Sequence, residues 1–204
     1  PQLICATPTF ILSRIWPDAP ADMLQAAAAI EHAPWLVANL SLSRMPEERR
    51  GAQLSWDNVI YQSPGLGYVV ATHQQIRTRP GPTVLTYYRA FGGADTKQSR
   101  QQLLATPRET WTETILAEME RIHPNIRQIT TNVNITRYGH AMAKPTTGSL
   151  WHGKRALLSR PVGRIQLAHA DLSGFSIFEE ANYHGVRCAE NALAALGYAS
   201  RSLL

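Results

Sequence analysis

The sequence predicts an α/β protein that is interrupted by an antiparallel sheet domain of the α+β type. Two short apolar segments, at residues 3–6 and 164–171, have the pattern of strands in a parallel sheet, and each is followed by a helix-like segment. Between them, several strand-like segments separated by Pro and Gly turns are typical of an antiparallel sheet. We therefore expect residues 31–150 to form a domain inserted between residues 1–30 and 151–204.

The composition is that of a globular protein. The 204 residues are 44% hydrophobic and 17% charged, which allows a sizeable core. The net charge of +5 comes from scattered basic residues, so we expect no nucleic-acid binding. No segment approaches the roughly twenty apolar residues of a membrane span. Cys5 and Cys188 lie far apart in the sequence, and this spacing indicates neither a disulfide framework nor a zinc site. We therefore expect no bound metal. We also expect a reducing, cytoplasmic location.

The first segment has the order strand, then helix. Residues 3–6 are a short apolar run that ends at Thr7-Pro8, as in a fully buried strand of a parallel sheet. Residues 21–30 are rich in alanine and predict a helix. Because Pro1 comes just before this strand, without a charged or long apolar leader, we expect the chain to begin in mid-fold, with an N-terminal part of the domain missing.

The middle of the chain is dominated by strands. Residues 62–67 carry Gly65 and Gly67 between two strand-like runs, which predicts a hairpin. Farther along, Trp111, Ile115 and Met119 lie on one stripe of a predicted helix. Ile129, Thr131, Val133 and Ile135 are expected to share one face of a strand. The expected strands are residues 35–42, 58–61, 68–72, 83–88 and 129–138, and the expected helices are residues 99–104 and 110–122.

The last segment combines a strand, a carboxylate and a long helix. Residues 164–171 predict a strand that ends at Asp171, and a helix follows to about Leu196. Ser176 and Glu179 match the S-x-x-E capping box, which would define where the helix begins. In α/β proteins such strand ends hold ligands, because the free amides and the dipole of the helix N-terminus favour negative charge. The alternative for Asp171 is a simple turn or helix cap.

Small residues recur along this predicted helix at spacings of three and four. Glycine inside a helix costs about 1 kcal/mol relative to alanine, so we expect a close approach to explain Gly185. One face could therefore lie against a sheet or a flat ligand. The small residues are Ala181, Gly185, Cys188 and Ala192.

Several motifs resemble a known family. The closing motif of the flavin-containing amine oxidases is similar to Leu167-Ala-His-Ala-Asp171 followed by Phe178-Glu-Glu-Ala-Asn-Tyr-His-Gly185 and Ala189. The substrate domain of related bacterial FAD-dependent oxidoreductases is similar to Trp56-Asp-Asn-Val-Ile-Tyr61, Leu66-Gly-Tyr-Val-Val-Ala-Thr-His73 and Tyr138-Gly-His-Ala-Met-Ala-Lys-Pro145. The chain departs from the family pattern where Ala170 and Glu180 replace Gly and where His184 replaces Ser.

The resemblance implies that the chain is the C-terminal half of an FAD-dependent oxidoreductase, in which flavin accepts a hydride equivalent from an organic substrate such as an amine. Residues 1–30 and 151–204 would be pieces of a Rossmann-like FAD-binding domain, and residues 31–150 a substrate-binding domain. Asp171 would accept a hydrogen bond from the flavin ribityl chain, and the helix start would face the pyrimidine edge of the flavin. The implied cofactor-binding residues are Asp171, Ala170, Ile177, Phe178, Glu179 and Ala181.

Candidate substrate residues follow from the same resemblance. Tyr138 and His140 would line a cavity beside the flavin, although ordinary polarity at a strand edge is an equal alternative. Many amine oxidases place a lysine on the first strand of the substrate domain. Residues 35–42 contain no lysine, and Asn39 is the nearest match. No catalytic residue is assigned, and His169 is expected to be a structural histidine.

Two other functions remain open. The chain could descend from such an enzyme and serve as a non-catalytic binding or assembly subunit, which the missing lysine would fit. It could also be a stand-alone α+β binding module whose helix N-terminus holds a different anion.

Overall fold

The computed structural model describes residues 1–47, 51, 53–74, 79–93, 95–149, 151, 153–199 and 201–204. These residues form two compact units, one made of residues 1–32 and 142–204 and the other of residues 33–141. The second unit is thus inserted into the first. Its limits are residues 33 and 141, against the expected 31 and 150.

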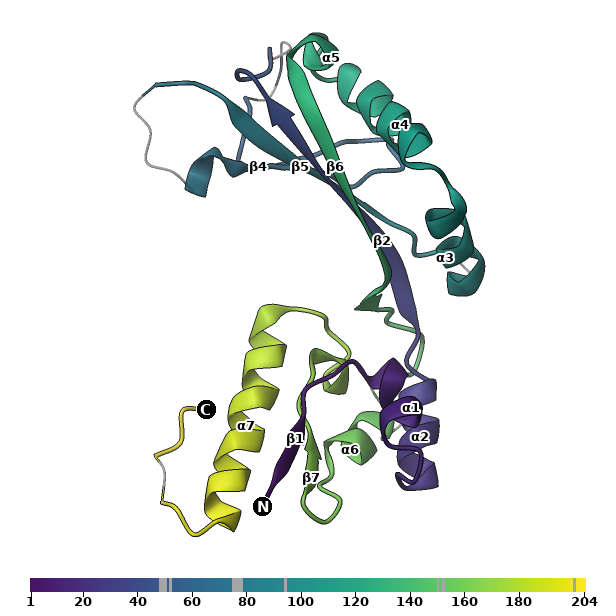
Figure 1. The fold of residues 1–204 in the computed structure, drawn as a ribbon, viewed down its shortest axis with the longest axis vertical. Coiled ribbons are helices and arrows are strands. Elements are labelled where there is room, and N and C mark those ends of the chain that lie inside the picture. Colours follow the sequence, from purple (N-terminus) through teal and green to yellow (C-terminus); the bar gives the residue numbers. More distant parts are fainter. Residues whose placement is uncertain are drawn as a thin grey trace. The chain divides into compact units, whose positions relative to one another are not determined.

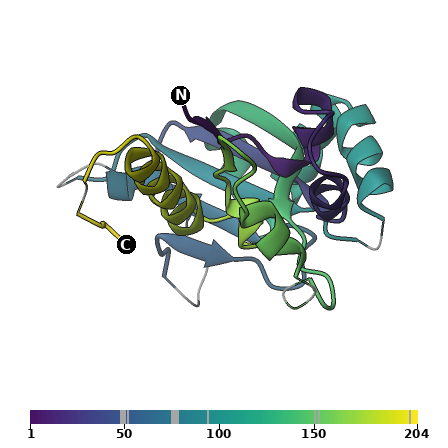
Figure 2. The same cartoon turned by 90° about the horizontal axis from the view of Figure 1, so that it is seen from below.

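In the first unit, a pair of parallel strands lies between helices (Figures 1 and 2). Strand β1 pairs with β7 in the register Leu3↔Ile165 and Cys5↔Leu167. Helix α7 runs along one side of this pair, and α2 and α6 lie on the other side. The elements are β1 (Leu3–Cys5), η1 (Thr9–Ile11), α1 (Leu12–Ile15), α2 (Ala21–Ala28), α6 (Lys154–Ser159), β7 (Ile165–Leu167), η3 (Ala170–Leu172) and α7 (Phe178–Ala195).

Two expectations about these strands are wrong. Strand β1 is not fully buried, because Leu3 and Ile4 are 53% and 40% exposed. Among the described residues its only neighbouring strand is β7, so a larger parallel sheet that would cover it is not present. Strand β7 ends at Leu167, and Asp171 lies four residues farther on in the 3-10 turn η3.

The core of the first unit forms where the alanine-rich helix α2 packs on α6. Met23, Ala26 and Ala27 from α2 are buried together with Leu158 from α6 and Leu167 from β7. The small alanine side chains let the two helices approach closely. Each fully buried Met or Leu side chain contributes about 1.5–3 kcal/mol of stability.

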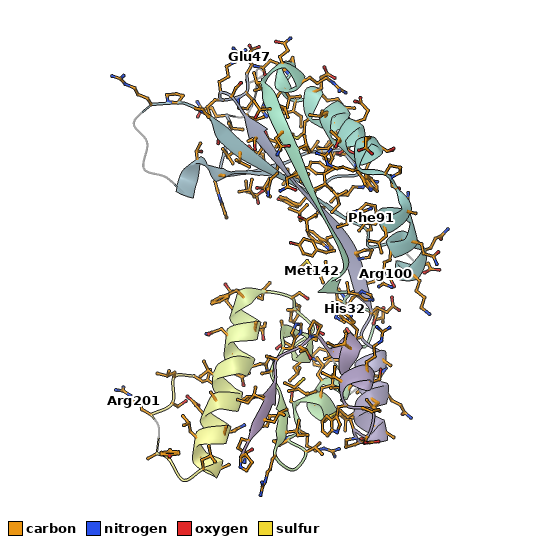
Figure 3. All side chains as sticks on the ribbon, viewed as in Figure 1. His32, Glu47, Phe91, Arg100, Met142 and Arg201 are labelled. Atoms are coloured by element: carbon orange, nitrogen blue, oxygen red, sulfur yellow. The ribbon has the colours of Figure 1, made fainter. Side chains whose placement is uncertain are left out.

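The second unit is an antiparallel five-stranded sheet, as the sequence predicted, with the strand order β3-β4-β5-β2-β6. Helices α3 and α4 cover one face of it (Figure 1). Arg100, labelled in Figure 3, donates from α3 to the Gly139 carbonyl of β6 at 2.5 Å. The elements are β2 (His32–Leu42), β3 (Asp57–Val59), β4 (Gly67–Val70), η2 (Ala71–Gln74), β5 (Thr83–Ala90), α3 (Thr96–Ala105), α4 (Arg108–Glu120), α5 (Ile126–Ile129) and β6 (Thr130–Ala143).

Alternation along the strands separates a buried face from an open one. On β2 the alternate residues Leu36 to Leu42 are buried, whereas Asn39 is exposed on the opposite face. The predicted stripe of α4 is confirmed, because Trp111, Ile115 and Met119 are all buried in this core. Phe91, labelled in Figure 3, packs edge-on against Trp111.

The predicted hairpin is confirmed, and both of its glycines are needed for the backbone to pass. Strands β3 and β4 pair antiparallel, with Val59 opposite Gly67. Gly67 has a φ of +149°, which favours glycine. Both positions also lack space for a side chain, because a Cβ at Gly67 would lie 2.0 Å from the Asn58 carbonyl oxygen and a Cβ at Gly65 would lie 2.6 Å from the ring of the buried Tyr87.

Strand β6 begins one residue later than predicted. Ile129 belongs to the short helix α5, and its carbonyl accepts a hydrogen bond from the Ser43 amide. Val133 is buried as expected, but Thr131 is exposed, so the predicted shared face holds only in part. Among the described residues, no helix is both long and apolar enough to cross a membrane.

Candidate ligand site around Asp171

The carboxylate of Asp171 is held almost entirely through one of its oxygens. Oδ2 accepts hydrogen bonds from the amide and the hydroxyl of Thr9, at 2.9 and 2.7 Å. The same oxygen lies 3.1 Å from Nε2 of His32, which is labelled in Figure 3, and 3.2 Å from Nδ1 of His169. Four groups from three segments of the chain thus converge on one oxygen of a side chain that is 1% exposed.

The other oxygen of Asp171 is different. Oδ1 is buried and has no hydrogen-bond partner among the described residues. A buried polar atom without a partner costs about 1–3 kcal/mol, and more when it carries charge. The arrangement therefore suits a ligand group that donates a hydrogen bond to Oδ1 while the protein holds Oδ2.

Burial of Asp171 opposes its ionisation, but the surrounding donors outweigh that effect. Hydrogen bonds from His169, His32 and the Thr9 amide, together with the charge of His32, hold the pKa of the Asp171 carboxyl well below its usual range. Asp171 is therefore an anion at neutral pH. Its carboxylate oxygens are therefore strong hydrogen-bond acceptors.

Sequence reasoning missed two of these partners. Thr9 lies 162 positions from Asp171, and no local pattern marks either Thr9 or His32 as its neighbour. His169 was expected to be structural; its Nδ1 accepts a hydrogen bond from the Asp171 amide and lies 3.2 Å from Oδ2. The sequence predicted only that the first strand ends at Thr7-Pro8, which places Thr9 just after a strand end but does not indicate its contact with Asp171.

The predicted capping box at the start of α7 is wrong. The N-cap residue is Ile177, and no side chain of the described residues caps the helix there. The Ser176 hydroxyl instead accepts a hydrogen bond at 2.8 Å from the amide of Ala143, at the end of β6. This tertiary contact replaces the local one because Ser176 lies one residue too early to be the N-cap.

The residues that the resemblance implied at this helix start are largely exposed. Ile177 and Phe178 are 48% and 77% exposed, and the neighbouring Phe175 is 46% exposed. These three apolar side chains are thus accessible at or just before the start of α7. The amide of Ala181 donates to the Ile177 carbonyl at 3.3 Å, so it is already used within the helix, and Ala170 is buried beside Asp171.

Glu180 and His184, which depart from the family pattern, form a cluster with Ser173. The Ser173 hydroxyl donates to Glu180, and its oxygen lies 2.7 Å from Nε2 of the buried His184. Burial lowers the pKa of His184, and the charge of Arg187 lowers it further, against the opposing effect of Glu180. Because Glu179 and Glu180 both lie in the first turn, the helix start is a weaker anion site than the sequence suggested.

A pocket that is partly open to solvent adjoins Asp171, and its cavity volume is about 70 Å³. It lies entirely within the first unit, between the end of α2, the segment after β6 and the start of α6. Its charged residues are Lys144, Lys154, Arg155 and Asp171. The remaining lining residues are Ala29, Ile30, Ala143, Pro145, Thr146, Thr147, Ser149 and Gly174.

The three candidate substrate residues lie in the second unit, on the face of the sheet opposite α3 and α4. Asn39 is exposed there, and its Oδ1 accepts a hydrogen bond from Thr86 at 2.8 Å. On β6, alternation places Tyr138 and His140 on the face opposite the buried Val133. Tyr138 is 49% exposed. The sheet therefore brings these three residues to one face.

An aromatic pair on this face was not predicted. The rings of Trp35 and Tyr88 stack with centroids 6.3 Å apart, and the Tyr88 hydroxyl donates to Asp57 at 2.7 Å. Burial, together with the Asp57 contact, raises the pKa of Tyr88 to about 12. Within the described ranges, no group of His, Cys, Asp and Glu side chains could hold a metal ion.

Neither a protein-family model nor a curated protein sequence matches this chain. Solved structures do. Cyclohexylamine oxidase from Brevibacterium oxydans IH-35A matches 96% of the chain with a TM-score of 0.70 and 13% identity. Wild-type putrescine oxidase bound to putrescine matches 95% with a TM-score of 0.71 and 19% identity. The chain has the fold of part of an amine oxidase.

The match covers most of this chain but less than half of each solved structure. The chain spans 43% of the cyclohexylamine oxidase and 42% of the putrescine oxidase. A putative protoporphyrinogen oxidase from Exiguobacterium sp. 255-15 is also similar, with a TM-score of 0.60, 15% identity and 41% of its length covered. The predicted resemblance to part of an amine oxidase is therefore confirmed at the level of the fold.

Proposed function

We propose that this chain is part of an FAD-dependent oxidoreductase that oxidises an organic substrate, with an amine as the first class to test. The observation that carries the proposal is the Asp171 carboxylate, which is held through Oδ2 and leaves Oδ1 buried without a partner among the described residues. The fold supports this assignment, because the amine oxidases named above share it over nearly the whole chain.

In this proposal the residues of the first unit bind and orient the cofactor. Asp171 accepts a hydrogen bond from a hydroxyl of the ribityl chain through Oδ1, which would relieve the cost of an unpaired buried acceptor. The exposed side chains of Ile177 and Phe178, with Ala181 one turn later, cover apolar ring surface. Ala170 holds Asp171 in the η3 turn, and the amide of Glu179 faces the ring edge. When bound, FAD supplies the acceptor for a hydride equivalent.

The open sheet face of the second unit would contact the substrate. Asn39, Tyr138 and His140 supply polar atoms on this face, and the Trp35–Tyr88 pair supplies aromatic surface. Aromatic rings attract organic cations such as protonated amines, with energies of about 0.5–2 kcal/mol. Since Asn39 is a neutral acceptor and donor, this chain would rely on orientation and exclusion of water rather than on a cationic side chain here.

Flavin binding tests the proposal. The chain is titrated with FAD, and binding is followed by the quenching of flavin fluorescence. Asp171→Asn should weaken binding about tenfold, because a charge-assisted hydrogen bond becomes a neutral one. Asp18→Asn, at an exposed residue of the same unit, is the matched control. FAD binding that is absent, or equal in wild type and Asp171→Asn, would refute the assignment of Asp171.

Anaerobic addition of amines to the FAD-loaded chain then tests the reaction. Loss of the visible absorbance of oxidised flavin on adding an amine would establish substrate oxidation. Stable flavin that no amine reduces would instead favour a non-catalytic binding subunit. Retained folding without flavin binding would favour a stand-alone binding module.

A further inference from the structure

A hydrogen-bonded cluster joins helix α7 to the turn that carries Asp171. Ser173 directly follows η3, and its amide donates to the Ala170 carbonyl at 3.0 Å, so Ser173 closes that turn. Its hydroxyl donates to Glu180 and lies 2.7 Å from Nε2 of His184. Glu180 and His184 are four residues apart on α7, and they therefore reach Ser173 from the same side of the helix. The cluster thus connects the Asp171 turn to α7.

The hydroxyl proton of Ser173 determines which ring nitrogen of His184 carries hydrogen. A serine hydroxyl has one proton and a carboxylate is an acceptor, so this proton goes to Glu180. Nε2 of His184 must then donate to the serine oxygen, because this contact would otherwise contain no hydrogen. A neutral ring with its hydrogen on Nε2 has a bare lone pair on Nδ1. The cluster therefore holds His184 in one neutral tautomer.

Nδ1 of His184 is the atom that would take up a further proton, and its position opposes this. His184 is 4% exposed, Nδ1 is buried, and no described residue forms a hydrogen bond with it. A protonated Nδ1 would be a buried donor without an acceptor among these residues, and such a donor is unfavourable. Protonation of His184 is therefore coupled to movement of the ring out of its site.

The groups around His184 also favour its neutral form. Burial is the main reason why the pKa of His184 lies below its ordinary value. The charge of Arg187 lowers it further, and among the described residues Arg187 donates to the Leu167 carbonyl rather than to a carboxylate. His169, between β7 and η3, acts in the same direction, whereas Glu180 favours protonation. The other titratable groups beside the cluster are Tyr183, Cys188, Arg155 and Asp171.

We propose that Ser173, Glu180 and His184 form a proton-sensitive clamp, which holds the Asp171 turn on α7 while His184 is neutral and releases it when Nδ1 takes a proton from the solvent. In the released form both N–H groups of the imidazolium reach water, which accepts their hydrogen bonds. Because Asp171 lies in the held turn, any ligand of Asp171 binds less tightly to the released form. The clamp goes beyond the proposed function, since it requires neither flavin nor substrate.

The direction of the pH dependence follows from the two forms. In the released form His184 has its ordinary pKa of 6.5, and in the held form its pKa is lower. The clamp is therefore fully effective above pH 6.5, and the released form becomes more populated as the pH falls below that value. This population should rise by up to about tenfold for each pH unit. The effect of Asp171 begins only below its ordinary pKa of 3.8, so the two ranges are separate.

Hydrogen exchange of the full chain, measured by mass spectrometry on peptides from residues 168–185, reports the release. Dividing the rates by those of the same peptides free in solution removes the intrinsic pH dependence of exchange. From pH 7.5 to pH 5.5 the opening constant of the wild type should rise by about threefold to tenfold. His184→Gln keeps a neutral donor toward Ser173, so its opening constant should change by less than about twofold. His169→Gln removes the neighbouring imidazole and should keep the rise seen in the wild type.

Nitrogen-15 NMR of the wild type tests the clamp without a substitution. The neutral ring of His184 should give the signals of the tautomer with hydrogen on Nε2, and it should titrate below pH 6.5. Hydrogen on Nδ1 of the neutral ring would overturn the clamp. An equal rise of the opening constant in wild type and His184→Gln, or loss of the rise only in His169→Gln, would also overturn it. Because no flavin is added, these outcomes leave the FAD proposal unchanged, and failure of FAD binding would leave the clamp standing.

Discussion

Replacement of Asp171 by asparagine should destabilise the first unit in a pH-dependent way. At pH 7 the two hydrogen bonds from Thr9 to Oδ2 change from charge-assisted to neutral, and each loses about 1–1.5 kcal/mol. We therefore expect Asp171→Asn to lower the free energy of unfolding by about 2–3 kcal/mol. The side chain is 1% exposed, so solvent screening does not reduce this figure.

The sign of the pH dependence follows from the direction of the pKa shift. In the unfolded chain the Asp171 carboxyl has its ordinary pKa of 3.8, and in the folded chain its pKa lies well below that value. The stabilisation is therefore complete well above pH 4 and is lost as the pH falls below 3.8. In that acid range the wild type should lose up to about 1.4 kcal/mol per pH unit that the variant does not lose.

Hydrogen exchange at increasing urea concentrations, read by mass spectrometry on peptides from residues 1–32, measures this unit separately from the sheet unit. Wild type and Asp171→Asn are compared from pH 7 down to pH 3, with Asp18→Asn as the control. Stability curves that run parallel over this range would refute the reasoning. They would mean that Asp171 titrates alike in the folded and unfolded chains.

The remaining predictions concern backbone space and the start of α7. Gly65→Ala should destabilise the sheet unit by about 1–3 kcal/mol, because the new Cβ would lie 2.6 Å from the ring of Tyr87. Gly92→Ala, where a Cβ meets nothing within 4 Å, should change the urea midpoint little. Ser176→Ala should cost about 1 kcal/mol by removing the acceptor of the Ala143 amide, with no change in helix content by circular dichroism. A loss of helix content would restore the capping-box interpretation.

Periodic patterns predicted the elements of the sheet unit well. Apolar residues alternate around Leu36 and Leu40 on β2, and Trp111 and Met119 lie on one stripe of α4. Both patterns arise because one face of the sheet and one face of the helix are buried in the same core. The hairpin at Gly65 and Gly67 was also predictable, because few residues allow such a turn. Patterns of this kind lie within one element, where the sequence contains all the interacting residues.

The candidate site was predicted only in outline. Asp171 was identified, but the strand before it is shorter than the pattern suggested, and its partners Thr9 and His32 were not found. The capping box failed because the Ser176 hydroxyl is engaged by a distant amide. A local motif competes with tertiary hydrogen bonds of similar energy, so its sequence alone does not decide the outcome.

By itself the sequence determined the class of fold, the order of its elements and the position of the carboxylate, since hydrophobic periodicity and turn residues act over short distances. Only the tertiary structure decided which oxygen of Asp171 is held and which is left buried without a described partner, because the groups concerned come from segments up to 162 residues apart. The same holds for the pocket in which Lys144 and Lys154 meet. Charge and hydrogen bonding depend on distance in space, and that distance is set by the packing of the whole unit.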